Sequence, residues 1–192
     1  MIDSGSGIPI VLIPAGGGTK EMLVRAMAQL PTPQSDPLPF GSKAFETIAL
    51  AKVSASGPDA ERLGYLAATD AFTMNRERLI ADAKAKALER VREGYHQPAP
   101  STAIAVGGES VTAALSLAVH LMWRGGRASD HDALIGRKLA HIFGGGNLPH
   151  ATTVTEQYLL DLEREAFMSL LGERKTLDRI QHTLKTGKPL RN

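Results

Sequence analysis

The sequence predicts a mainly α-helical protein with little or no β-sheet. Apolar residues recur every three or four positions along most segments, which is the spacing of one face of a helix. Residues typical of helix starts and helix ends separate these segments. After residue 20, only the run TDAFTMN (residues 69–75) has the character of a strand, and its alternation is weak.

The first predicted helix runs from Thr19 to Leu30 and follows an apolar run and three glycines. Thr19 is the expected N-cap, and Glu21 in the first turn suits the helix dipole. One face of this helix is apolar and should be buried; it consists of Met22, Leu23, Ala26, Met27 and Leu30.

The segment that follows alternates loops and helices up to residue 94. Four prolines in residues 31–42 predict a loop. Helices are then expected at residues 43–54, at residues 56–66 with Pro58 in the first turn, and from an Asn75 cap to Gly94.

The remainder is expected to be helical after an extended, proline-containing stretch at residues 95–108. A domain boundary is placed at this stretch, which divides the chain into residues 1–94 and residues 95–192. The predicted helices are Ser110–Arg124, one opened by Ser129 with Asp132, one opened by a capping box of Thr153 with Glu156, and a last amphipathic one ending at Gly187.

Composition narrows the class of protein. Hydrophobic residues make up 43% of the 192 residues, enough for a core, and the net charge is only +2 with bases and acids interspersed. A dense basic face for nucleic acid is therefore not expected. The chain has no cysteine, which excludes a thiol nucleophile and thiolate metal ligands. No apolar run is long enough for a membrane span, and no signal peptide is apparent, so a cytoplasmic protein is expected.

The glycine-rich turn of Gly16, Gly17, Gly18 and Thr19 is the main candidate binding site. Glycines allow close approach of the backbone, and free amides at a helix start favour an anion or oxyanion. The turn does not match a P-loop, because no hydroxyl residue follows Lys20, and it does not match a dinucleotide fingerprint. The alternative is a tight joint whose glycines serve packing only.

Other polar residues give no clear catalytic set, so no catalytic residue and no metal site are assigned. Asp130, His131 and Asp132 are adjacent, but at a helix start, where acidic residues have a capping role. His120 is expected to be an ordinary helix residue. A stand-alone enzyme with Glu46, Glu61 or His96 in an unrecognised pocket remains a third alternative.

Two sets of motifs resemble a known family. IPAGGGTKEMLVRA (residues 13–26), AFETIALAKVSASGPDAERLGYL (residues 44–66) and the following AATDAFTMN resemble the second half of the crotonase (enoyl-CoA hydratase/isomerase) domain. SDHDALIGRKLAHIFGGGNLP (residues 129–149), VTEQYLLDLEREAFMSLLGE (residues 154–173) and IQHTLKTGKPLRN (residues 180–192) resemble the C-terminal tail of bacterial multifunctional 3-hydroxyacyl-CoA dehydrogenases.

This resemblance implies a function and also what the chain should lack. It implies a truncated crotonase-like portion at residues 1–94, a helical tail domain at residues 95–192, acyl-CoA substrates and fatty-acid β-oxidation. The nearer of the two family glutamates would fall around Gly7, where no carboxylate stands, and the other glutamate and both oxyanion amides would precede Met1. The NAD-binding half has no counterpart in this sequence. No cofactor is therefore expected on this chain, with NAD used by the full-length family enzyme, and no turnover is expected from the chain alone.

The resemblance also leaves a rival class open. In this alternative, the chain is a non-catalytic helical module that binds CoA or mediates assembly. Family members of the crotonase type oligomerise, and amphipathic helices without the sheet they normally cover would expose apolar residues. A homo-oligomer, or association with the other part of the enzyme, is therefore expected.

Overall fold

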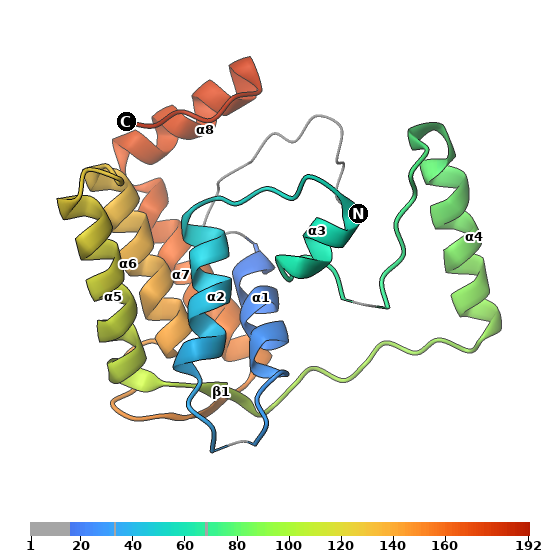
Figure 1. Ribbon diagram of the computed structural model, residues 1–192, viewed down its shortest axis with the longest axis horizontal. Helices are drawn as coiled ribbons and strands as arrows, with labels where there is room; N and C mark the ends of the chain where they lie inside the picture. Colours follow the sequence, from blue (N-terminus) through green and yellow to red (C-terminus); the bar gives the residue numbers. More distant parts are fainter. Residues whose placement is uncertain (1–15, 33, 68) are drawn as a thin grey trace.

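The computed structural model describes residues 16–32, 34–67 and 69–192. Eight α-helices, one 3-10 turn and a two-stranded sheet are present in these residues, so the predicted mainly α fold is confirmed (Figure 1). The elements are α1 Gly18–Met27, α2 Leu38–Ala49, α3 Gly57–Arg62, η1 Arg76–Arg78, α4 Leu79–Arg92, β1 Ile104–Val106, α5 Gly108–Arg124, α6 Asp130–Gly144, β2 Thr152–Val154, α7 Glu156–Leu171 and α8 Arg174–Thr186.

The core lies between α1, α2, α5, α6 and α7. The most extensive packing joins α5 to α6, and Phe45 of α2 meets Phe143 of α6 edge to face with ring centroids 5.7 Å apart. The predicted apolar face of α1 is buried at Met22, Leu23, Ala26 and Met27. Burial of such faces is the main driving force for a helical fold of this kind.

The small sheet joins two segments that are far apart in sequence. β1 pairs antiparallel with β2, with Ile104 opposite Val154 and Val106 opposite Thr152. Ile104 and Val106 are buried, so β1 forms part of the core beneath α1. The prediction of a strand at residues 69–75 is wrong, because that segment has no regular structure and no partner strand in the part of the chain described.

Helix starts defined by a nearby side chain agree with the sequence. As predicted, Ser129 and Asp132 form a reciprocal capping box at α6, and Asn75 caps η1 just before α4. Ser56, which was not named as a cap, accepts the amide of Asp59 at α3. All of these caps join residues no more than three positions apart, so sequence reasoning could find them.

Several predicted boundaries are wrong, among them the starts of α1, α2 and α7. α1 begins after Gly17 and not at a Thr19 cap. α2 begins at Leu38, inside the stretch predicted as a loop, because proline is tolerated in the first turn of a helix. The N-cap of α7 is Thr155, which accepts the Tyr158 amide, whereas Thr153 lies in β2.

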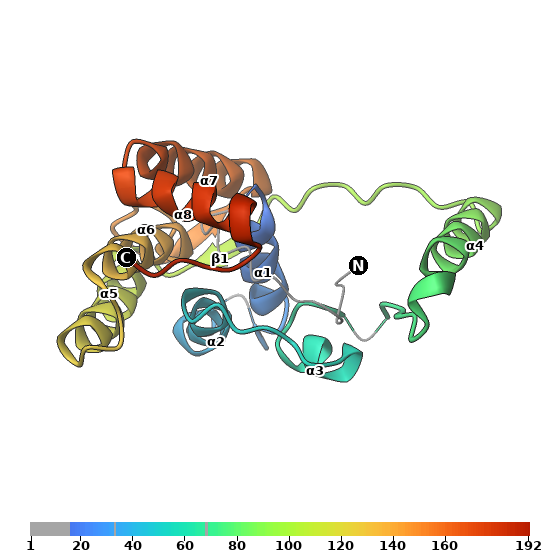
Figure 2. The same cartoon turned by 90° about the horizontal axis from the view of Figure 1, so that it is seen from above.

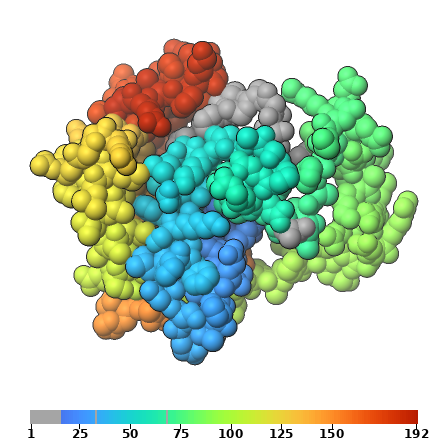
Figure 3. All heavy atoms as spheres, viewed as in Figure 1, coloured from blue at the N-terminus to red at the C-terminus, as the bar shows by residue number. Residues whose placement is uncertain are grey.

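The helix α4 stands apart from the rest of the molecule. None of its residues is buried, and extended segments connect it on both sides (Figures 1 and 2). In the space-filling view it forms one edge of the molecule (Figure 3). Ile80 and Val91 on this helix are 83% and 73% exposed, although both are large apolar residues.

The common core contains residues from both sides of the boundary predicted at residues 94/95. Met22 and Phe45 belong to the same buried cluster as Val111 and Leu139. The two-domain division stays a prediction. Within the described residues, none of the helices combines the length and apolar character required to cross a lipid bilayer.

Candidate functional site

The glycine-rich turn lies where the chain enters α1. Gly17 has a φ of +99°, a conformation that residues with a side chain rarely adopt. Its carbonyl accepts the amide of Glu21, which closes the first turn of the helix. Gly16 and Gly18 are exposed, whereas the Thr19 side chain is buried.

The amides of this turn bind a carboxylate of the same chain. Glu163 of α7 is 2% exposed, and its Oε1 accepts the backbone N–H groups of Gly17 at 3.1 Å and Thr19 at 3.2 Å. Its Oε2 accepts the N–H of Lys20 at 3.1 Å. The positive end of a helix favours an anion at this position, and Glu163 supplies it.

This arrangement bears on the acyl-CoA contact expected at Gly16, Gly17, Gly18 and Thr19. Free amides at this helix start were expected to attract an anion, and the anion that they bind in the structure is the Glu163 carboxylate of the same chain. A contact of these residues with acyl-CoA stays a prediction.

A second polar network lies beside the turn. The Lys20 ammonium group contacts the carboxylates of Glu21 at 2.9 Å and Glu156 at 3.1 Å, and Glu156 also accepts the backbone N–H of Ser101 at 2.7 Å. Burial opposes the charge of Lys20, but the two carboxylates outweigh it and raise the pKa of Lys20. The Ser101 amide and then Lys20 lower the pKa of Glu156. The network ties α1, α7 and the segment before β1 together.

The residues around His131 have separate structural partners. His131 is buried, with its Nε2 2.9 Å from Thr176 Oγ1 of α8. Asp130 accepts the Trp123 indole N–H at 2.7 Å, and Asp132 caps α6 and pairs with Arg179. No group of three or more potential metal ligands occurs among the described residues.

The remaining candidates lie at the surface. Glu46, Glu61, His96 and His120 are all exposed, and Glu46 pairs with Lys52 at 2.7 Å. The structure encloses none of these four side chains in a shielded pocket, so their geometry gives no support to a catalytic role.

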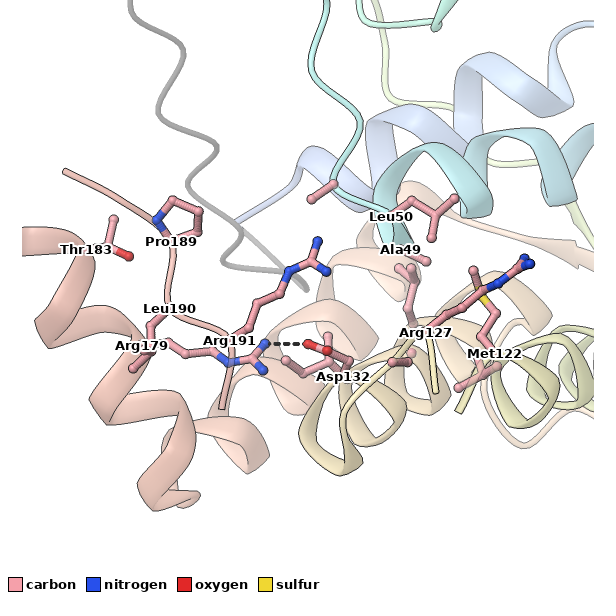
Figure 4. Close-up of a pocket in the computed structure, with 16 residues that line it drawn as sticks. Ala49, Leu50, Met122, Arg127, Asp132, Arg179, Thr183, Pro189, Leu190 and Arg191 are labelled. Atoms are coloured by element: carbon pink, nitrogen blue, oxygen red, sulfur yellow. Dashed lines mark hydrogen bonds and ion pairs between the residues drawn. The ribbon is translucent and has the colours of Figure 1, made fainter. Parts of the chain in front are cut away.

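A cavity of about 200 Å³ lies between α2, α5, α6, α8 and the segment after α8 (Figure 4). Its wall is largely apolar, with Leu50, Val119 and Leu139 among the lining residues. Three arginines and one aspartate also line it, which gives an excess of two positive charges; they are Arg127, Arg179, Arg191 and Asp132.

Arg179 is held in place at the cavity. Its guanidinium donates to Asp132 Oδ1 and to Asn192 Oδ1, both at 2.8 Å. Burial alone would raise the pKa of Asp132, but the Ser129 amide and Arg179 lower it. Sequence reasoning missed this cavity, because its lining comes from separate helices and no single stretch carries a recognisable motif.

Comparison with known proteins gives one informative relative. Over all 192 residues the chain is 43% identical to a protein described as a "Probable 3-hydroxyacyl-CoA dehydrogenase" of Bacillus subtilis (strain 168). The chain is a homologue of one region of this dehydrogenase. The expected resemblance to a bacterial 3-hydroxyacyl-CoA dehydrogenase is thereby confirmed. The chain spans 23% of the length of this relative.

The other two comparisons add no relative. No family model matches the chain, and no solved structure matches it.

Proposed function

We propose that this chain is the C-terminal part of an acyl-CoA-processing enzyme of the 3-hydroxyacyl-CoA dehydrogenase/enoyl-CoA hydratase type, acting in fatty-acid β-oxidation in the cytoplasm. The observation that carries the proposal is the 43% identity to the Bacillus dehydrogenase along the whole chain. Homology of this extent supports a shared role in the enzyme, although the relative is much longer.

In this proposal the chain has a supporting role and carries out no chemistry by itself. NAD would be used by another part of the enzyme. The glycine-rich turn supports this view, because Glu163 already accepts the backbone amides of Gly17 and Thr19 and that of the adjacent Lys20. These three hydrogen bonds are suited to holding α1 against α7.

The test is a calorimetric titration of the folded chain with acetoacetyl-CoA, beside assays of crotonyl-CoA hydration and of NAD-dependent 3-hydroxyacyl-CoA oxidation. Saturable binding without turnover would support a contribution to the acyl-CoA site. Turnover in either assay would contradict the supporting role. Absence of both binding and turnover would restrict the chain to a structural part of the enzyme.

A second candidate function is a non-catalytic helical module for assembly, either with a second copy or with another part of the enzyme. The exposed apolar side chains on α4, an arm without any buried residue, favour this candidate. Sedimentation velocity from micromolar to hundreds of micromolar protein tests self-association. Ile80→Ser with Val91→Ser should shift the chain toward the monomer if α4 is the contact.

A further inference from the structure

We propose that the cavity between α2, α5, α6, α8 and the segment after α8 binds a short aliphatic carboxylate. The hydrocarbon chain occupies the apolar interior, and the carboxylate meets Arg191 at the mouth. This inference rests on the geometry of the cavity and does not depend on the proposed function.

The interior of the cavity suits a hydrocarbon chain. Val119 and Leu139 are buried at 4% and 0% exposure, and Ile135 and Met122 extend the same apolar wall. Burial of each methylene of a ligand favours the binding free energy by about 0.8 kcal/mol. An apolar cavity of ~150 Å³ binds benzene, so the 200 Å³ here accommodates a chain of about six carbons.

The charge at the cavity suits an anion. Arg179 is neutralised by Asp132, which leaves Arg127 and Arg191 as lining cations. Neither of these two has an acidic partner in the part of the chain that the structure describes. An aliphatic amine would meet the same two cations and be repelled.

The arrangement of the two arginines selects a small head group. Figure 4 shows Arg191 reaching from the C-terminal segment toward Ala49 and Leu50 at the end of α2, whereas Arg127 lies beside Met122. The two guanidinium groups therefore flank different parts of the cavity. A single guanidinium binds one carboxylate through two parallel hydrogen bonds, so a monocarboxylate fits Arg191 alone.

The experiment is an NMR titration of the ¹⁵N-labelled chain with sodium hexanoate, followed at the amides of Ala128 and Leu190. The expected result is saturable shifts with a Kd of about 1 mM or tighter. Hexan-1-ol and hexylamine have the same chain without the anion, and acetate has the anion without the chain; each should bind at least tenfold more weakly.

Two variants and one control locate the ligand. Arg191→Gln should weaken hexanoate binding about tenfold, because it removes the cation but keeps a polar side chain. Ala49→Leu places a larger side chain at the mouth and should weaken binding by a similar factor. Arg124→Gln removes an exposed arginine outside the cavity and should leave binding unchanged.

The proposal is overturned if hexanoate causes no saturable shifts in the folded chain up to 20 mM. It is also overturned if Arg191→Gln and Ala49→Leu both bind as tightly as the unchanged protein. Since hexanoate carries no CoA, either result leaves the acetoacetyl-CoA titration to decide the proposed function separately.

Discussion

The Glu163 carboxylate accepts the Lys20 backbone N–H at 3.1 Å across a separation of 143 residues. This contact, together with the two from Gly17 and Thr19, connects the start of α1 to the middle of α7. Each of these amides lies at a helix start or just before it, where the helix itself supplies no acceptor. Glu163 therefore has the role that a cap residue usually has, but from a distant part of the chain.

Replacement of this carboxylate should strongly destabilise the fold. Glu163→Ala leaves up to three buried or half-buried amides without an acceptor, and we expect the free energy of unfolding to fall by about 2–4 kcal/mol. Urea denaturation followed by circular dichroism measures this loss of unfolding free energy. Glu165→Ala, at an exposed position of the same helix, is the matched control and should change little. Equal stability of the two variants would show that the buried carboxylate contributes nothing.

Stability should also decrease in mild acid because of His131. Burial, followed by the charges of Arg179 and Lys175, lowers the pKa of His131 in the folded chain below the unfolded value of about 6.5. The unfolded state thus binds the proton more readily, so stability is fully present above pH ~6.5 and is lost as the pH falls below it.

The pH dependence can be assigned to this residue by substitution. His131→Gln should flatten the dependence of the unfolding free energy between pH 6.5 and pH 5, measured by urea denaturation. His120→Gln changes an exposed histidine and should leave the slope as it was. A slope that is identical in His131→Gln and the unchanged protein would exclude His131 as its source.

The packing of α5 on α6 depends on the absence of a side chain at Gly136. A Cβ at this position would lie 2.8 Å from Val119 Cγ2, closer than two carbon atoms normally approach. Gly136→Ala should therefore lower the free energy of unfolding by about 1–3 kcal/mol, despite the higher helix propensity of alanine.

Gly18→Ala is the opposite case and serves as the comparison. No atom lies within 4 Å of the added Cβ, and φ at Gly18 is in the ordinary range. This variant should be as stable as the unchanged protein or up to about 1 kcal/mol more stable. If Gly136→Ala were also stabilising in thermal melts, the close approach of the two helices would be disproved.

The arm α4 should exchange its backbone hydrogens much faster than the core helices. A 14-residue helix without buried residues is only marginally stable in water, whereas α6 contains Leu139, Ala140 and Ile142 at 0% exposure. Hydrogen exchange followed by mass spectrometry should show exchange rates in α4 that are several orders of magnitude higher than those in α6. Protection of α4 equal to that of α6 would mean that another surface covers it.

The parts of this fold that the sequence predicts correctly depend on local interactions. The caps at Asn75 and Ser129 bind amides two or three residues away, and the apolar face of α1 follows from helix periodicity alone. Thr19 was a reasonable N-cap by the same reasoning, but Glu163 performs the task from another helix.

Long-range pairing explains the other errors. β2 is three residues long, and its pairing with β1 joins Val106 to Thr152, which no local pattern indicates. The binding cavity combines Leu50, Arg127, Ile135 and Arg191 from four separate segments. Neither feature could be found without the three-dimensional arrangement.

The distance along the chain between α1 and Glu163 also has a consequence during protein synthesis. Ribosomes add about 5–20 residues per second, so the 143 residues after Lys20 take roughly 7–30 s to appear. Throughout that interval the nascent α1 lacks its acceptor and most of its packing partners. The pair α5 and α6, close in sequence and extensively packed, can form before the α7 carboxylate leaves the exit tunnel. Although α1 is translated before the other helices described here, it is therefore among the last of them to be fixed in place.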